Sequence, residues 1–183
     1  MLVILSGVSG AGKNTVINRL LEEGDNRFLI KSATTREPRG GGIDNNYEFM
    51  SDEEFARREK NGEFFETIDA HAHKYATQFK ELEKVTSNPQ NIYMKDIDVV
   101  GTQKLVSHLA DKAKVLTIFL DAPDEVLYDR LIKRGESEEK ANFRLSRAKM
   151  EREFKDKYDL VIENIDIEKT LEKIRKRLKK EGF

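Results

Sequence analysis

Short apolar runs alternate with amphipathic stretches along most of the chain. The runs have the length and the unbroken hydrophobicity of strands buried inside a parallel sheet. They span residues 2–6, 28–32, 92–96, 115–120 and 160–163. Apolar residues recur between them at helical spacing over residues 14–23, 99–110, 124–134 and 167–180. This alternation predicts an α/β fold in which helices cover both faces of a parallel sheet.

An inserted segment interrupts the alternation. Residues 33–91 carry shorter strand-like pieces at 47–50 and 64–68, with a helical stretch between them. Ser51 and Glu54 have the spacing of a capping box at the start of that helix. The segment is therefore predicted to form an α+β subdomain.

A second interruption, residues 135–157, is almost wholly charged. Its pattern is helical, with Ser137 as the expected N-cap and acidic residues in the first turn. A charged helix with little apolar surface is either a mobile lid or a solvated helix. The composition alone favours the solvated helix.

Composition narrows the class of protein. The 183 residues suffice for one domain with a sizeable core. Lys and Arg number 33 against 34 Asp and Glu, a balance that argues against binding nucleic acid in bulk. Cysteine is absent, which excludes disulfides and thiolate metal sites and agrees with a cytoplasmic location. The first apolar run is too short for a signal peptide, and no segment has the length of a membrane span, so no membrane partner is expected.

The first apolar run leads directly into a glycine-rich turn, a lysine and a helical stretch. Such a turn brings backbone N–H groups and a helix N-terminus to face a polyphosphate, and the lysine reaches its outer phosphates. An ordinary glycine-rich turn is the alternative. The residues predicted to bind ATP are Gly7, Ser9, Gly10, Ala11, Gly12, Lys13, Asn14 and Thr15.

Asn14 departs from this motif, which has Ser or Thr after the lysine to ligate magnesium. Two readings remain open. Asn14 offers an amide oxygen or a water-mediated contact while Thr15 supplies the hydroxyl, or magnesium binding is weakened and catalysis is lost.

A second group of residues indicates another phosphate site. Arg36 and Arg39 lie three residues apart and are stiffened by Pro38, so that two planar guanidinium groups can hold one phosphate. The motif Ser-Ala-Thr-Thr-Arg-Glu-Pro-Arg of residues 32–39 contains both arginines. Further along come Tyr47, Asn-Gly-Glu-Phe-Phe-Glu ending at Glu66, Tyr-Ala-Thr at 75–77, and Asp-Ile-Asp at 96–98 followed by Gly101.

These motifs, in this order, resemble those of guanylate kinases over essentially the whole chain. The resemblance implies a P-loop nucleoside monophosphate kinase that transfers a phosphoryl group from ATP to GMP. It also implies a core of residues 1–32, 92–124 and 158–183, an NMP-binding subdomain of residues 33–91 and a helical lid of residues 125–157. Nucleotides are the implied partners of a monomer or weak homodimer.

The resemblance assigns roles to individual residues. Arg36, Arg39, Tyr47 and Tyr75 would hold the GMP phosphate, and Ser32, Glu66, Thr77 and Asp96 would read the guanine. A carboxylate suits guanine because it accepts from N1–H and the 2-amino group, whereas adenine has an acceptor at N1. The residues implied in catalysis are Lys13, Arg36, Arg39, Arg130, Arg134 and Arg144. Asn164 would lie on the adenine side, and Asn14, Thr15 and Asp98 would hold Mg²⁺ directly or through water.

Some positions differ from the family pattern. The loop of residues 40–46 looks one residue short and begins with three glycines. Lys95 replaces an apolar residue in a core strand, where a charged group must reach solvent or find a partner. Two alternatives therefore stay open: a divergent kinase for another nucleotide or small acceptor, and a non-catalytic guanylate-kinase-like binding domain. The surviving phosphate loop and lid arginines favour the kinase.

Overall fold

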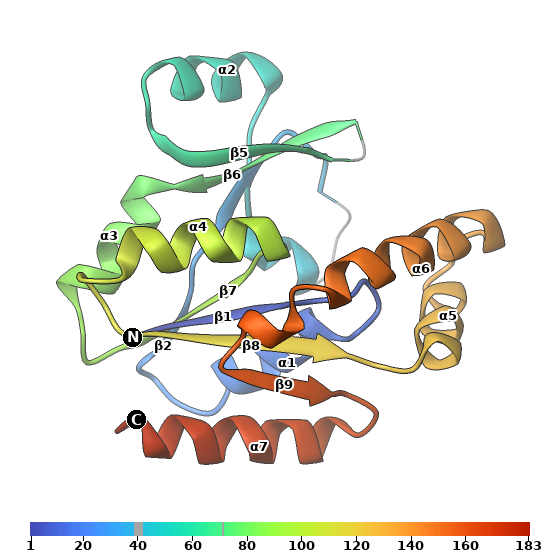
Figure 1. The fold of residues 1–183 in the computed structure, drawn as a ribbon. Helices are drawn as coiled ribbons and strands as arrows, with labels where there is room; N and C mark the ends of the chain where they lie inside the picture. The colour runs from blue at the N-terminus through green and yellow to red at the C-terminus, as the bar shows by residue number, and fades with distance from the viewer. Residues whose placement is uncertain (39–41, 71) are drawn as a thin grey trace.

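The centre of the molecule is a sheet of five parallel strands. A computed structural model describes residues 1–38, 42–70 and 72–183. The strands are β1 (Leu2–Gly7), β2 (Arg27–Leu29), β7 (Ile92–Asp96), β8 (Val115–Asp121) and β9 (Leu160–Glu163), in the spatial order β2-β7-β1-β8-β9. The sheet and the helices around it (Figure 1) confirm the predicted α/β class.

Helices cover both faces of this sheet, as an all-parallel sheet requires. Val3 and Leu5 of β1 belong to a core that includes residues of α1 (Lys13–Leu21) and α7 (Ile167–Lys180). Leu2 and Ile4 belong to a second core with residues of α3 (Phe79–Ser87) and α4 (Val99–Leu109). The alternation along β1 thus follows the two-residue period of a strand.

The strand predicted at residues 28–32 forms, but its predicted C-terminal end is wrong. Strand β2 stops at Leu29, although the N–H of Ile30 still donates to the carbonyl of Met94. The Lys31 N–H then donates to the carboxylate of Glu81, and Ser32 begins a strand of a different sheet. One apolar run therefore serves two sheets, which hydrophobicity alone does not reveal.

The second sheet has four strands in the order β4-β3-β6-β5. These are β3 (Ser32–Thr34), β4 (Tyr47–Phe49), β5 (Phe64–Ala70) and β6 (His73–Gln78), and a 3₁₀ helix (Gly42–Asn46) precedes β4. Strands β4 and β5 match the pieces predicted at 47–50 and 64–68, but β3, β6 and α3 were missed. The sequence of β6 has too few apolar residues to signal a strand.

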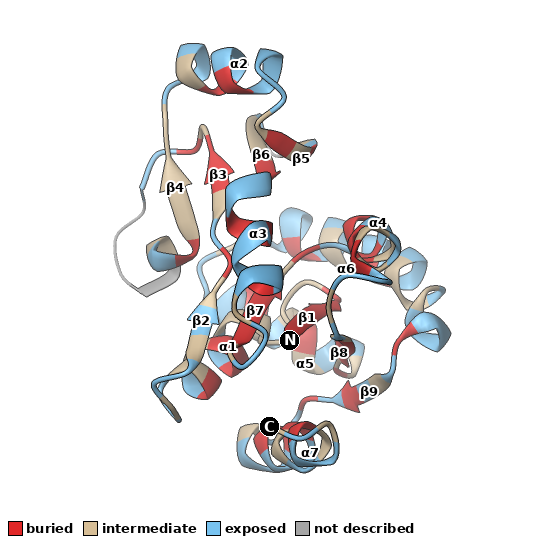
Figure 2. Cartoon of the chain, turned by 90° about the vertical axis from the view of Figure 1, so that its left-hand side faces the viewer, coloured by how far each residue is buried: buried red, intermediate tan, exposed pale blue. Residues whose placement is uncertain are grey.

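Helix α2 (Asp52–Lys60) packs on the outer face of this second sheet (Figure 2). Phe55 of α2 packs there with Ala33, Phe64 and Ala76. The Ser51 hydroxyl accepts from the Glu54 N–H, so the predicted N-cap is confirmed. In a full capping box the Glu54 carboxylate would also accept from the Ser51 N–H. Here it accepts from the Arg57 guanidinium instead.

Two helices, α5 (Asp124–Lys133) and α6 (Glu138–Arg152), project from the carboxyl end of β8 (Figure 1). The Ser137 hydroxyl caps α6 by accepting from the Lys140 N–H, as predicted. Only Ala141 and Ala148 of α6 are buried. A short 3₁₀ helix (Lys155–Lys157) returns the chain to β9. Within the described ranges, no helix combines the length and hydrophobicity needed to cross a membrane.

Candidate active site

A cleft of about 910 Å³ lies between the carboxyl end of the large sheet, the second sheet and helices α5 and α6. Ligands of open α/β sheets bind at this end of the strands. The described residues of the predicted site that line the cleft are Gly7, Ser9, Gly10, Gly12, Lys13, Asn14, Thr15, Ser32, Arg36, Tyr47, Glu66, Tyr75, Thr77, Asp96, Asp98, Arg130, Arg134, Arg144 and Asn164. Arg39 lies outside the described residues.

The glycine-rich turn between β1 and α1 forms one wall of the cleft. Gly7, Gly10 and Gly12 have φ values of 125°, 89° and 90°, which L side chains rarely adopt. A Cβ on Gly7 would lie 2.0 Å from the Leu120 carbonyl oxygen, so no side chain fits there. The Lys13 ammonium folds over the turn and donates to the Gly7 carbonyl at 2.9 Å. The turn is an anion cradle whose lysine is already in place.

Asn164 and Ala11 support this turn from behind. Ala11 is one of the residues predicted to bind ATP, but its side chain is fully buried and does not line the cleft. Only its backbone is placed to support the turn. Its carbonyl accepts from Asn164 Nδ2 at 2.7 Å, and Asn164 Oδ1 accepts from the Thr170 hydroxyl. Both ends of the Asn164 amide are thus engaged, and its predicted contact with adenine stays a prediction.

One face of α6 lines the cleft, so the prediction of a merely solvated helix is wrong for that face. Arg144 pairs with Glu136 and donates to the Ser9 hydroxyl at 3.0 Å. From α5, Arg130 donates to the Asn164 carbonyl at 2.9 Å, and Arg134 is exposed at the rim of the cleft. Arg130 and Arg144 therefore contact the phosphate loop, and Arg134 lines the same cleft.

Glu151, also on α6, is a cleft residue that the sequence analysis missed. One of its carboxylate oxygens is buried and has no hydrogen-bond partner among the described residues. Burial raises the pKa of Glu151, while the nearby Lys13 and Arg147 oppose that rise. The signal was present in the spacing of Arg144, Arg147 and Glu151, which repeats on one helical face.

The second sheet presents a row of side chains to the cleft. Strand register pairs Glu66 with Thr77, Thr77 with Ser32, and Ser32 with Tyr47. Directly paired residues share a face of a sheet, so these four side chains form one line across it. Tyr75 lies two residues from Thr77 and therefore on the same face. The pairing of β3 and β6 assembles residues that are far apart in sequence.

Glu66 is the acid in this row and is 8% exposed. Its Oε2 has no hydrogen-bond partner among the described residues, and the ammonium of Lys104 lies 3.7 Å away. Burial raises the pKa of Glu66, which Lys104 partly opposes. A Cβ on Gly101 would lie 2.7 Å from Glu66 Oε1, so this approach requires glycine. Oε2 thus has an ion-pair partner in Lys104 but still has the capacity to accept a hydrogen bond.

Asp96 and Lys95 lie at the end of β7, beneath the row. Burial raises the pKa of Asp96, and Lys13 and Lys95 oppose that rise. The Lys95 side chain is 1% exposed, and its ammonium donates to the Ser32 hydroxyl at 2.9 Å. A lysine in a core strand was expected either to reach solvent or to find a partner, and Lys95 has a partner in Ser32. Burial lowers the pKa of Lys95 to about 8, against the pull of Asp96, Glu66 and Glu81.

Arg36, which follows β3, brings a positive charge to the cleft on the side of the second sheet. It is 5% exposed, pairs with Asp44 at 2.9 Å, and its guanidinium lies 5.0 Å from the centre of the Tyr47 ring. The Tyr47 ring in turn meets Tyr75 edge to face at 6.0 Å. These packed contacts hold the guanidinium at the cleft, where it can bind an anion.

Oxygen groups beside the phosphate loop suit Mg²⁺. Asp98 caps α4 through one oxygen, which accepts from the Gly101 N–H at 2.7 Å. The Asn14 amide oxygen accepts from Asn46 at 3.3 Å, and Thr15 is exposed at the cleft. No group of three or more His, Cys, Asp or Glu that could hold a metal occurs among the described residues. Magnesium is typically held by one or two carboxylates together with substrate phosphates, which fits Asp98 and the orphaned Glu151 oxygen.

A parallel sheet with a phosphate loop at its carboxyl edge, facing an arginine on a second sheet, defines a P-loop kinase. The family model described as guanylate kinase matches residues 1–181. A guanylate kinase of Porphyromonas gingivalis is 38% identical over 182 residues, 97% of this chain and 95% of the relative. A guanylate kinase of Clostridium perfringens is 35% identical over 176 residues, which are 95% of this chain and 80% of the relative. The chain belongs to the guanylate kinase family.

Solved structures agree with this assignment. The crystal structure of guanylate kinase from Anaplasma phagocytophilum superposes with a TM-score of 0.72 at 30% identity, covering 99% of this chain and 85% of that one. A shikimate kinase from Bacteroides thetaiotaomicron, 16% identical with a TM-score of 0.55, shares the fold alone and covers 98% of both chains.

Proposed function

We propose that this chain transfers the γ-phosphoryl group of ATP to GMP, giving ADP and GDP. The observation that carries the proposal is the buried Glu66 carboxylate, whose Oε2 has no hydrogen-bond partner among the described residues, placed across the cleft from a formed phosphate loop. A carboxylate there is satisfied by the N1–H and 2-amino donors of guanine and is left unpaired by adenine. The alternatives named above gain no support from the described residues.

The donor nucleotide occupies the phosphate-loop side. Backbone N–H groups at the start of α1 bind the triphosphate, because the first N–H groups of a helix have no partner within the helix and face an anion at its N-terminus. Lys13 neutralises the outer phosphates and follows the transferring group. Arg130, Arg134 and Arg144 close over it from residues 125–157, which act as the lid.

The acceptor nucleotide occupies the second sheet, within an NMP-binding subdomain of residues 33–91. Arg36, with Arg39, Tyr47 and Tyr75, holds its phosphate. Ser32, Glu66, Thr77 and Asp96 read its base. The row order supports this division, because Glu66 and Tyr47 lie at opposite ends of the line of side chains across the sheet.

Transfer requires position and charge rather than a general base. The acceptor phosphate is already an anion, so its oxygen attacks the γ-phosphorus, the bond to the β-phosphate oxygen breaks, and ADP leaves. Cationic side chains from both walls offset the charge of the transferring group. Closure of the arginines excludes water, which would otherwise accept the phosphoryl group.

Magnesium is the proposed cofactor. When bound with ATP it would supply positive charge that offsets the charge of the phosphate groups. Asn14, Thr15 and Asp98 would hold it directly or through water, and Glu151 adds a fourth oxygen donor. The amide oxygen of Asn14 can serve as such a donor, so the missing hydroxyl does not remove the site.

The test is ADP formation from Mg-ATP with GMP, dGMP, AMP, UMP, CMP and dTMP as acceptors. Turnover restricted to GMP and dGMP is expected. Lys13→Ala should lower turnover by several orders of magnitude. Glu66→Ala should raise KM for GMP while leaving KM for ATP unchanged, and the exposed carboxylate of Glu83 offers the matched control, Glu83→Ala. Turnover with another acceptor, or equal losses for both nucleotides in Glu66→Ala, contradicts the proposal.

A further inference from the structure

Lys95 is a cation buried in an otherwise apolar layer under the acceptor side of the cleft. Its neighbours on β7 and β1 include Tyr93, Leu2 and Ile4, which belong to the core between the large sheet and helices α3 and α4. Its one hydrogen bond to a side chain among the described residues goes to Ser32, on the second sheet. A charge this deep is costly, so its contact with a cleft residue needs a reason beyond packing.

The direction of that hydrogen bond is determined by chemistry. A protonated lysine has three donors and no acceptor, so the Ser32 oxygen must accept. The Ser32 hydroxyl proton is then directed elsewhere, and it reaches no acceptor among the described residues. Ser32 lines the cleft, whereas Lys95 does not. The lysine therefore leaves Ser32 as a hydrogen-bond donor facing the ligand.

We infer that Lys95 is a positioning residue that holds the Ser32 hydroxyl as a donor toward an acceptor oxygen of the bound nucleoside monophosphate. The inference rests on the proposed function and names a further determinant of substrate choice. Ser32 lies between Thr77 and Tyr47 in the row, within the span that joins the base-reading and phosphate-holding ends. The acceptor is therefore the 6-oxo group of guanine or an oxygen of its phosphate. With the 6-oxo group, the donor also selects against adenine, whose 6-amino group donates.

The surrounding charges keep the lysine protonated at neutral pH. The negative charges of Asp96 on β7, Glu66 on β5 and Glu81 on α3 favour the ammonium, while burial disfavours it. At a pH well above 8 the amine loses its proton and can accept from Ser32. The hydroxyl would then turn away from the ligand, so acceptor binding should weaken in the same range.

The test is a double-mutant cycle on the full chain with Lys95→Met and Ser32→Ala. Each single variant should raise KM for GMP about tenfold, the usual effect of losing one hydrogen bond to a ligand. KM for ATP should change by less than about twofold. The double variant should be no worse than Ser32→Ala, because the lysine acts only through that hydroxyl. Lys114→Met, which removes a surface lysine paired with Glu181, is the matched control.

Two further measurements separate the outcomes. Calorimetric titration with guanosine tests which oxygen accepts: weaker binding to Lys95→Met indicates the 6-oxo group, and unchanged guanosine binding with weakened GMP binding indicates the phosphate. In the unmutated protein, KM for GMP should rise above about pH 8, and Lys95→Met should lack this rise.

Additive losses in the cycle, or equal rises of both KM values, overturn the inference. Thermal unfolding of each variant identifies a loss of folding, and the pH profile of the unmutated protein then provides the test. If the unmutated protein does not phosphorylate GMP, the proposed function fails instead.

Discussion

At the residue scale, the acceptor side of the cleft concentrates ionisable groups that burial has displaced from their usual pKa values. Burial raises the pKa of Glu66 and of Asp96, and lowers that of Lys95. Each shift records a charge held away from water, and the opposite charges offset one another only in part. Perturbed groups of this kind collect at functional sites, and here Asp96 and Lys95 lie beside the row to which Glu66 belongs.

The displaced pKa of Lys95 predicts how stability depends on pH. In the unfolded chain this lysine keeps its proton up to about 10.5, whereas the folded protein releases it near 8. Between these values the unfolded state binds more protons, so the free energy of unfolding rises with pH by up to about 3 kcal/mol from this group. That contribution is lost as pH falls through 8. Denaturant unfolding from pH 7 to 10.5 should show the rise, and Lys95→Met should lack it. Parallel curves for the two proteins would contradict the prediction.

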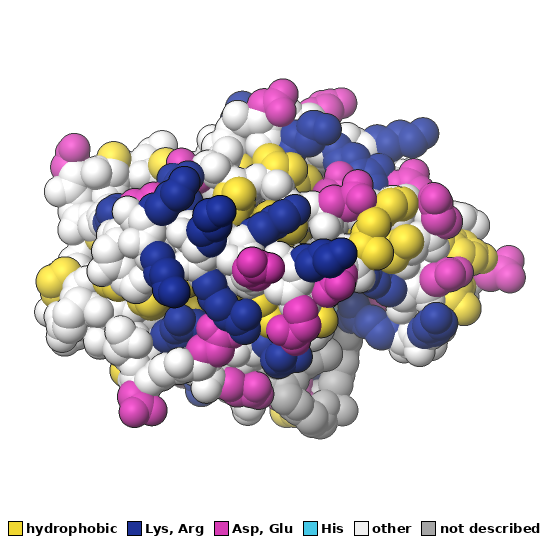
Figure 3. Space-filling model, turned by 90° about the horizontal axis from the view of Figure 1, so that it is seen from below, with side chains coloured by type: hydrophobic (Ala, Val, Ile, Leu, Met, Phe, Trp, Pro, Cys, Tyr) yellow, Lys and Arg dark blue, Asp and Glu magenta, His cyan; other side chains and the backbone are white. Residues whose placement is uncertain are grey.

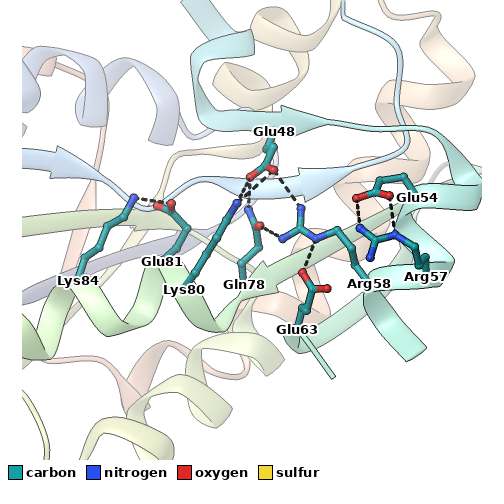
Figure 4. Close-up of polar contacts among 9 residues, drawn as sticks. All are labelled: Glu48, Glu54, Arg57, Arg58, Glu63, Gln78, Lys80, Glu81 and Lys84. Carbon is teal, nitrogen blue, oxygen red and sulfur yellow. Dashed lines mark hydrogen bonds and ion pairs between the residues drawn. The ribbon is translucent and has the colours of Figure 1, made fainter. Parts of the chain in front are cut away.

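At the scale of elements, a polar network holds the second sheet in the shape that the row requires. Arg58 of α2 is 6% exposed and bonds to Glu48 on β4, Gln78 on β6 and Glu63 before β5 (Figure 4). Glu48 and Gln78 follow Tyr47 and Thr77 directly, so they point away from the cleft. One guanidinium thus ties together, from behind, strands whose front faces line the cleft.

Replacing Arg58 should therefore destabilise the protein. Arg58→Met removes the ion pairs with Glu48 and Glu63 and leaves the buried Gln78 Oε1 without its donor. This loss costs about 2–4 kcal/mol and lowers the melting temperature by several degrees. Arg57→Met is the matched control, because Arg57 lies on the same helix and makes only an exposed pair with Glu54 (Figure 4). Scanning calorimetry compares the two. Equal melting temperatures for both variants would show that the network contributes little.

At the scale of the whole molecule, the cleft lies between three parts of the chain. The phosphate loop, the second sheet and the α5–α6 pair each supply one wall. Charged side chains gather on a different part of the surface, the underside of the molecule. There α7 and its surroundings carry many lysines and arginines, interspersed with acidic residues (Figure 3). The basic character of that face is balanced elsewhere, since the net charge is −1.

A ligand that spans the cleft should bind more tightly than either nucleotide. Joining adenosine and guanosine through an oligophosphate makes the second contact intramolecular, and an affinity gain of about 10²–10⁴-fold is expected. Calorimetric titration of the linked compound against ATP and GMP measures the gain. Arg36→Ala should remove most of it, since that arginine lies on the acceptor wall. An affinity no better than that of the tighter single nucleotide would show that the two walls do not form one site.

Much of the architecture could be predicted from local patterns. The strands at 92–96 and 160–163, the caps at Ser51 and Ser137, and the phosphate loop all depend on neighbouring residues. Predictions failed where the structure of a segment depends on residues distant along the chain. The run at 28–32 divides between two sheets, and β6 forms from a polar sequence because β3 and β5 pair with it on either side.

The sequence by itself determined the class of fold, the glycine-rich loop and the family motifs whose described residues line the cleft. Hydrophobic period, glycine spacing and short motifs are properties of residues close together in the chain. Only the tertiary structure decided which groups meet. It aligned Glu66, Thr77, Ser32 and Tyr47 in one row, turned Glu151 toward Lys13, and gave Lys95 its serine partner. Strand register and burial create these relations, and both depend on contacts between segments distant along the chain.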